Sequence, residues 1–189
     1  MNHPDWPAFV TAILADPDDD TVRLVAADFL EENGDPDRAA FIRVQCALAR
    51  LEADGGTKSL EADTLRRKER AFLGPLSHFC LLWAAEACPE LVRLNAQMRV
   101  EGADRLTWRR GFVEAVTCPS AEWLRHGVAV RARQPVREVD LTGCFPLARD
   151  RWYANLAALR GLRRVRVDTD TQGWLQLWLP GTEVDDILF

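Results

Sequence analysis

The sequence predicts a mixed α/β protein in which an N-terminal helical array caps a short, degenerate strand–helix solenoid. Three observations predict this fold. Apolar residues recur at helical spacing in the N-terminal half, apolar and polar residues alternate from residue 111, and a strand-like pattern then recurs along the chain. Since 48% of the 189 residues are hydrophobic, the chain has enough apolar material for a core. We expect a helical domain at residues 1–104 and a repeat segment at residues 105–189.

Prolines, glycines and aspartates divide the helical part into short segments. Asp5 and the aspartates at 18–20 precede apolar helical runs, where they are expected to act as N-caps. The same aspartates are numerous enough for a cation-binding loop, but they lack the glycine and the distal glutamate of an EF-hand. We therefore interpret them as caps and predict no metal site. The expected helices cover residues 6–16, 18–34, 35–55, 59–74 and 76–100, the last interrupted by Pro89.

Three segments of the C-terminal part share one pattern of apolar positions. They are Val113-x-x-Val116-x-Cys118, Val136-x-x-Val139-x-Leu141 and Leu162-x-x-Val165-x-Val167. The second follows the first by 23 residues and the third follows the second by 26 residues. Both offsets lie within the period of roughly 20–29 residues of leucine-rich repeats, whose strands read L-x-x-L-x-L-x-x-N/C. In the middle copy Cys144 supplies the last fixed position.

Helical spacing fills the intervals between these strand patterns. Residues 121–130 and 152–159 each carry apolar side chains about one helical turn apart, which completes strand–helix units. Units of this kind stack side by side, so their strands should form a parallel sheet. Residues 173–181 alternate apolar and polar side chains and are expected to form a closing strand that caps the stack.

The N-terminal segments ILADPDDD (13–20), RLVAADFLEENGDP (23–36) and RAAFIRVQ (38–45) carry a family resemblance. They resemble the bacterial repeat-companion domain, which reads I-x-x-x-P-x-D-D-x-x-R-L-V-Y-A-D-W-L-E-E-x-G-D-P and then E-F-I-R-x-Q. The chain departs from that pattern with Phe29 for tryptophan and Ala40 for glutamate. The resemblance implies that leucine-rich or similar repeats follow the helical domain, and it implies an adaptor role by analogy. It supplies no catalytic residues.

Charged residues within residues 13–45, which we call the family-like block, are open to two interpretations. Arg23 with Asp28, or Arg43 with Asp35, would tie neighbouring helices together by ion pairs. The same set includes carboxylates that would suit acid–base catalysis, but such catalysis requires a perturbed pKa in a cleft. We favour the structural interpretation.

The sequence also lacks the patterns that accompany common enzymatic chemistry. It contains no G-x-S-x-G, no glycine-rich phosphate loop and no histidine or cysteine pair at zinc spacing. Its five cysteines are odd in number and scattered, and no secretion signal precedes them, so they are expected to be reduced thiols. We therefore predict a cytoplasmic protein that is not an enzyme and has no cofactor.

The charge is distributed unevenly along the chain. Residues 1–60 carry 5 basic and 12 acidic side chains, whereas residues 105–166 carry 13 basic and 5 acidic ones. An arginine-rich segment with interspersed tryptophans suits phosphate contacts and base stacking. The acidic segments on either side of it are also able to neutralise it internally.

Two function hypotheses follow. The first is a protein-binding adaptor or scaffold, a candidate subunit of a larger bacterial assembly, with another protein as the partner and no membrane. Its partner surface would use outward side chains of the repeat strands, namely Arg137, Asp140, Thr142, Arg164, Arg166 and Asp168. The alternative is a nucleic-acid-binding accessory protein that uses Arg109, Arg110, Arg131, Arg133, Arg163 and Arg164.

Overall fold

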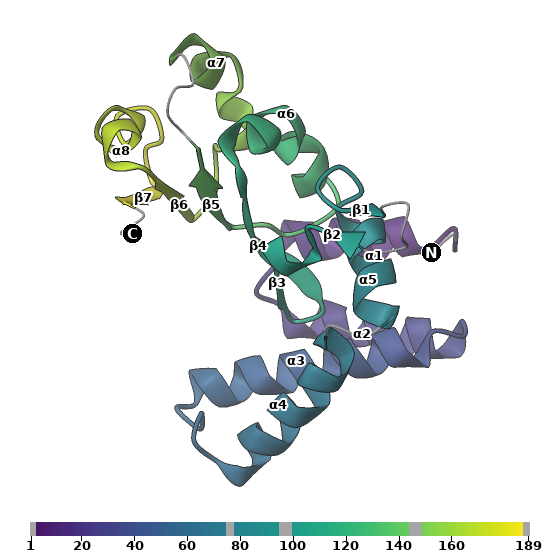
Figure 1. The fold of residues 1–189 in the computed structure, drawn as a ribbon. Helices are drawn as coiled ribbons and strands as arrows, with labels where there is room; N and C mark the ends of the chain where they lie inside the picture. Colours follow the sequence, from purple (N-terminus) through teal and green to yellow (C-terminus); the bar gives the residue numbers. More distant parts are fainter. Residues whose placement is uncertain (1–2, 75–77, 95–99, 144–148, 187–189) are drawn as a thin grey trace. The chain divides into compact units, whose positions relative to one another are not determined.

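The protein is a mixed α/β structure. The computed structural model describes residues 3–74, 78–94, 100–143 and 149–186 (Figure 1). Its α-helices within these ranges are α1 (Trp6–Ala15), α2 (Asp20–Glu32), α3 (Pro36–Ala53), α4 (Leu60–Leu73), α5 (His78–Ala87), α6 (Ser120–Arg131), α7 (Arg149–Ala154) and α8 (Thr169–Leu175). Two short 3₁₀-helices are η1 (Ala103–Arg105) and η2 (Leu156–Ala158).

The described strands form two sheets. A two-stranded antiparallel sheet pairs β1 (Arg93–Leu94) with β2 (Val100–Glu101). A five-stranded sheet has the order β3-β4-β5-β6-β7. Its strands are β3 (Leu106–Arg109), β4 (Phe112–Pro119), β5 (Glu138–Thr142), β6 (Arg164–Val167) and β7 (Glu183–Asp186). From β4 to β7 every neighbouring pair is parallel, and each crossover contains a helix.

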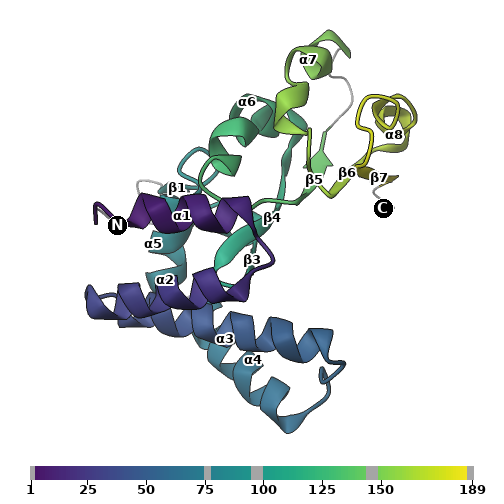
Figure 2. The same ribbon diagram turned by 180° about the vertical axis from the view of Figure 1, so that it is seen from behind.

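The chain divides into two compact units. The first unit comprises Met1–Ala87 with Trp108–Phe112, and the second comprises Cys88–Thr107 with Val113–Phe189. In the first unit α2 packs along α3, and α4 packs against α3 (Figure 2). The core of the first unit gathers apolar side chains from α1, α2, α3 and the start of β4, including Trp6, Ile13, Leu30, Ile42 and Phe112.

Helices α2 and α4 of the first unit begin close to the positions expected from the sequence, but one predicted N-cap does not form. Asp19 caps α2 by accepting a hydrogen bond from the Thr21 N–H, and Ser59 caps α4 in the same way from the Ala62 N–H. The prediction for Asp5 is wrong in its chemistry, because this residue precedes α1 with helical backbone angles and its side chain makes no capping bond.

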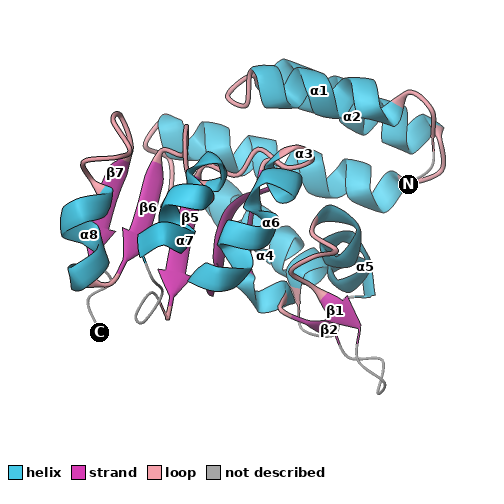
Figure 3. Ribbon diagram, turned by 90° about the horizontal axis from the view of Figure 1, so that it is seen from above, coloured by secondary structure: helices cyan, strands magenta, loops and turns pink. Residues whose placement is uncertain are grey.

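The strand register of the second unit reproduces the offsets predicted from the spacing of apolar residues. Val116 lies opposite Val139, and Val139 lies opposite Val165, which are the predicted offsets of 23 and 26 residues. Val184 of β7 continues this row opposite Val165. All four side chains are buried, and α6, α7 and α8 follow one another beside the strands (Figure 3). We call these four residues the valine row.

Two segments differ from their predicted secondary structure. Helix was expected through residues 91–94, but Arg93–Leu94 form strand β1 instead. A closing strand was expected at 173–181, yet Thr169–Leu175 form helix α8, and the closing strand is β7. Burial of Leu175 and Leu179 at i and i+4, with Leu177 exposed, shows that the apolar side of this segment has helical rather than strand period.

Other expectations were met more closely. The helix expected at 121–130 is α6, and the one expected at 152–159 is divided into α7 and η2. Cys144, assigned to the last fixed position of the middle repeat, lies outside the described residues. Among the helices that the structure describes, none has both the length and the apolar composition needed to cross a bilayer.

Candidate interaction surface

The valine side chains point to one face of the sheet. The other face carries charged residues that lie in register across the strands. Successive residues of a strand point to opposite sides, so the neighbours of each buried valine face outward. One row runs Ala115, Glu138, Arg164 and Glu183, and the next runs Thr117, Asp140, Arg166 and Asp185. We call these two rows on β5, β6 and β7 the charged rows.

Arg164 forms three ion pairs within the charged rows. Its guanidinium lies 3.0 Å from the Glu183 carboxylate, 3.3 Å from Asp185 and 3.7 Å from Glu138. The hydrogen bond to Glu183, together with the negative charges of Glu183, Glu138 and Asp185, raises the pKa of Arg164 above its ordinary value. Arg164 is therefore neutralised by carboxylates of both neighbouring strands.

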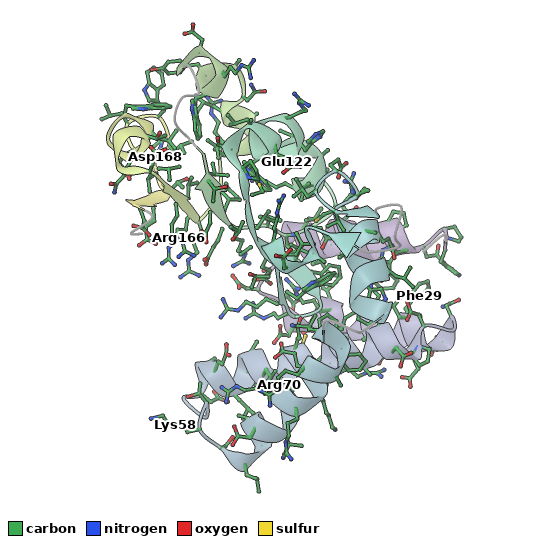
Figure 4. All side chains as sticks on the ribbon, viewed as in Figure 1. Phe29, Lys58, Arg70, Glu122, Arg166 and Asp168 are labelled. Atoms are coloured by element: carbon green, nitrogen blue, oxygen red, sulfur yellow. The ribbon has the colours of Figure 1, made fainter. Side chains whose placement is uncertain are left out.

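Arg166 repeats this arrangement one row further along β6. Its Nε donates a 2.6 Å hydrogen bond to Asp140 Oδ1, and 44% of its side-chain surface is exposed. Figure 4 labels Arg166 among the side chains. Thr142 is partly exposed at the end of β5. These placements bring four of the six predicted surface residues, Asp140, Thr142, Arg164 and Arg166, onto one face of two adjacent strands.

The other two predicted surface residues have additional structural roles. Asp168 is the N-cap of α8, where its carboxylate accepts a hydrogen bond from the Thr171 N–H. Arg137 precedes β5, where its backbone links two neighbouring strands: its N–H donates to the Glu114 carbonyl, and its carbonyl accepts from the Arg163 and Arg164 N–H groups. The candidate surface is therefore centred on β5 and β6 rather than on their ends.

Three acidic members of the charged rows were not predicted from the sequence, namely Glu138, Glu183 and Asp185. The repeat pattern leaves two residues between its first two apolar positions, so alternation alone does not decide whether Arg137 or Glu138 faces outward. Glu183 and Asp185 were missed because β7 was not recognised. The available signal is the alternation of acidic and apolar residues in Glu183-Val184-Asp185, and it is only three residues long.

Two side chains of the family-like block form hydrogen bonds with the turn between β3 and β4. Arg110 and Gly111 both have positive φ, which is the conformation of a tight two-residue hairpin turn. Arg23 is fully buried and donates hydrogen bonds to the carbonyl oxygens of Arg109, Arg110 and Pro17. Its guanidinium also lies over the Phe112 ring, 5.2 Å from the centroid.

Gln45 holds the same turn from α3. It is buried, donates hydrogen bonds to the Trp108 carbonyl and to Glu69, and accepts one from the Gly111 N–H. Because the side-chain amide matches a backbone donor and a backbone acceptor at once, it substitutes for a strand partner at the turn. Two polar residues of the block, Arg23 and Gln45, are therefore explained by structure.

The expected ion pairs within the block are wrong in their partners. Arg43 binds Asp28 and Glu31, at 2.6 Å from each, instead of Asp35. The hydrogen bonds that Arg43 donates to these two carboxylates raise its pKa. Asp35 accepts a hydrogen bond from the Arg38 N–H as the N-cap of α3. The pairs still link α2 to α3, which is the structural role predicted for them.

The six arginines of the nucleic-acid alternative fall in both units, and most have partners in their own unit. In the first unit Arg109 lies 3.4 Å from Glu52, and Arg110 lies 2.9 Å from Asp20. In the second unit Arg133 pairs with Glu90, and Arg131 donates to the carbonyl of Arg160 at 2.7 Å.

Burial also lowers the pKa of Arg131. Arg164 belongs to the charged rows, and Arg163 is exposed. Phosphate binding by these arginines would therefore compete with their internal contacts.

The aspartates at the start of α2 have partners within the first unit. Asp19 caps the helix, while Asp18 and Asp20 both pair with Arg110. Within the part of the chain that the structure describes, no three His, Cys, Asp or Glu side chains gather closely enough to hold a metal ion.

Three cysteines are buried free thiols, namely Cys46, Cys88 and Cys118. Burial is the main cause that raises the pKa of each thiol to about 12. The reactive form of cysteine is the thiolate, so a raised pKa makes these groups poor nucleophiles near neutral pH. The side chain of Cys80 and the whole of Cys144 lie outside what the structure describes.

Alkylation is expected to distinguish the buried thiols from ordinary ones. At about pH 8 the raised pKa leaves a thiolate fraction roughly a thousandfold smaller than that of an unperturbed thiol. We therefore expect iodoacetamide to leave Cys46, Cys88 and Cys118 unmodified in the native protein and to modify all three in denaturant. Peptide mass spectrometry measures this, and rapid native labelling of any of the three would contradict it.

The chain was also compared with known proteins. No protein-family model, no curated protein and no solved structure matches it.

Proposed function

We propose that this chain is a non-enzymatic protein–protein interaction module, an adaptor or scaffold that works as a subunit of a larger bacterial assembly in the cytoplasm. The observation that carries the proposal is the pair of charged rows, which stand in register across three strands. Their side chains remain accessible, with 34% of Arg164 and 52% of Glu183 exposed. An ordered, accessible array of alternating charges suits recognition of a complementary protein surface.

We propose that the second unit is a degenerate leucine-rich-repeat-like solenoid capped by the helical array, and that the first unit is a repeat-companion-like domain. The valine row supports the solenoid, because its register reproduces the predicted repeat offsets. The contacts of Arg23 and Gln45 support the companion domain, because they give residues of the family-like block a role at the turn into the sheet.

Affinity capture of binding partners from cells that encode the protein tests this function. The tagged wild-type chain is compared with a face variant, Asp140→Arg with Asp185→Arg, and with a control, Glu61→Arg with Asp63→Arg, which changes the charge equally on exposed α4. We expect mass spectrometry to find a protein partner with the wild type and the control, and to lose it with the face variant. Recovery of nucleic acid alone, or equal recovery by all three baits, would contradict the proposal.

A further inference from the structure

The charged rows leave an excess of negative charge. Each arginine of β6 stands between carboxylates of β5 and β7 in register, so two guanidiniums face four carboxylates. Arg164 contacts three of these carboxylates and Arg166 contacts Asp140. Because the arginines are already neutralised by their neighbours, the charge that remains for a partner to meet is negative.

The outer edge of β7 is already occupied by side chains of the same unit. The Glu183 N–H donates to the Arg163 carbonyl on the β6 side, so the carbonyls of Thr182 and Val184 face the opposite edge. Gln176 Nε2 donates to the Thr182 carbonyl at 3.3 Å, and Gln172 Nε2 donates to the Val184 carbonyl at 3.0 Å. A partner that added a strand here would have to displace both amides.

These two observations define the chemistry of the partner. Resting on the proposed function, we infer that the strand face binds a basic segment of the partner protein, whose lysine or arginine side chains lie across the charged rows. Along a strand, the two charged rows are about 7 Å apart. This distance matches the spacing of cationic side chains at positions i and i+2 of an extended segment. A polyanion such as nucleic acid would be repelled by the same excess of carboxylates.

Opposite changes of the face charge test this inference on the full-length protein. One variant, Arg164→Gln with Arg166→Gln, removes both arginines of the rows. The other, Asp140→Asn with Glu183→Gln and Asp185→Asn, removes three of the four carboxylates. The probe is a labelled peptide of alternating lysine and serine, measured by fluorescence anisotropy at low salt, with a glutamate–serine peptide and a single-stranded oligonucleotide as comparison ligands.

We expect the arginine variant to bind the lysine peptide several-fold more tightly and the carboxylate variant to bind it about tenfold more weakly. The matched control, Asp37→Asn with Asp54→Asn and Glu61→Gln, removes the same number of exposed carboxylates in the first unit and should change binding less than about twofold. Circular dichroism of each variant verifies that the fold is kept.

The inference is overturned if the control weakens binding as much as the carboxylate variant, since net charge alone would then explain the effect. It is also overturned if the glutamate peptide or the oligonucleotide binds to the face. The adaptor function fails separately, through the capture experiment. If capture of the partner depends on the strand face while binding of the lysine peptide does not, that result would support the adaptor function and would show that the partner segment is not basic.

Discussion

Replacing Gly111 with alanine is expected to lower the free energy of unfolding by about 3 kcal/mol. Two physical costs combine at this position. Gly111 has φ of +83°, which side chains rarely adopt, and an added Cβ would lie 2.2 Å from Cγ1 and 3.0 Å from Cα of buried Ile42. Because a backbone atom of α3 is among the clashing neighbours, the turn and the helix would have to move apart.

Gly34→Ala is the matched control for this prediction. Gly34 lies in the same unit with φ of +87°, and nothing lies within 4 Å of its added Cβ. It should therefore show only the backbone cost, about 1 kcal/mol. Urea denaturation followed by circular dichroism measures both variants. Equal losses of stability would show that Gly111 does not pack closely on Ile42.

Replacing Arg23 with methionine is expected to cost about 3 kcal/mol of unfolding free energy. Methionine keeps the approximate length of the side chain but donates no hydrogen bonds, so the carbonyls of Pro17, Arg109 and Arg110 lose a charged donor. The contact of the guanidinium with the Phe112 ring is lost as well. Arg23→Lys should be intermediate, because one ammonium group does not reproduce the fork that reaches several carbonyls.

An exposed arginine provides the comparison for this substitution. Arg67 on α4 donates to the Asp63 carbonyl and the Thr64 hydroxyl, both on its own helix. Arg67→Met should change stability by less than about 0.5 kcal/mol. If chemical denaturation gave the same loss for Arg23→Met and Arg67→Met, the buried contacts of Arg23 would not hold the turn.

The order of helices and the register of the central strands could be predicted because each depends on local patterns. Capping residues and glycines lie within a few residues of the helix ends that they determine. Val116, Val139 and Val165 could be aligned by spacing alone, because a buried strand position admits few residue types. These predictions use only information that neighbouring residues carry.

The errors have a different cause, namely burial decided by distant parts of the chain. The alternating segment at 173–181 resembles a strand until Leu175 and Leu179 prove to be its buried residues. Strand β7 contains one valine among acidic residues, so its place in the sheet depends on pairing with β6 rather than on its own pattern.

The candidate site was predicted only in part for the same reason. Asp140, Thr142, Arg164 and Arg166 follow from alternation within predicted strands, whereas the acidic partners on β7 depend on a pairing that the sequence does not reveal. The targets of Arg23 and Gln45 are mainly backbone groups more than sixty residues away in the chain. A motif shows which side chains are polar, but it does not show which distant carbonyls they will bind.

The valine row separates the spacing of strands in the sheet from the length of chain that joins them. Successive members of the row, Val116, Val139, Val165 and Val184, are separated by unequal numbers of residues, yet each lies directly opposite the next. The differences in length are taken up in the crossovers, which α6, α7 and α8 fill to different extents. The sheet thus behaves as a fixed frame on which connecting segments can lengthen or shorten without moving the residues displayed on its outer face.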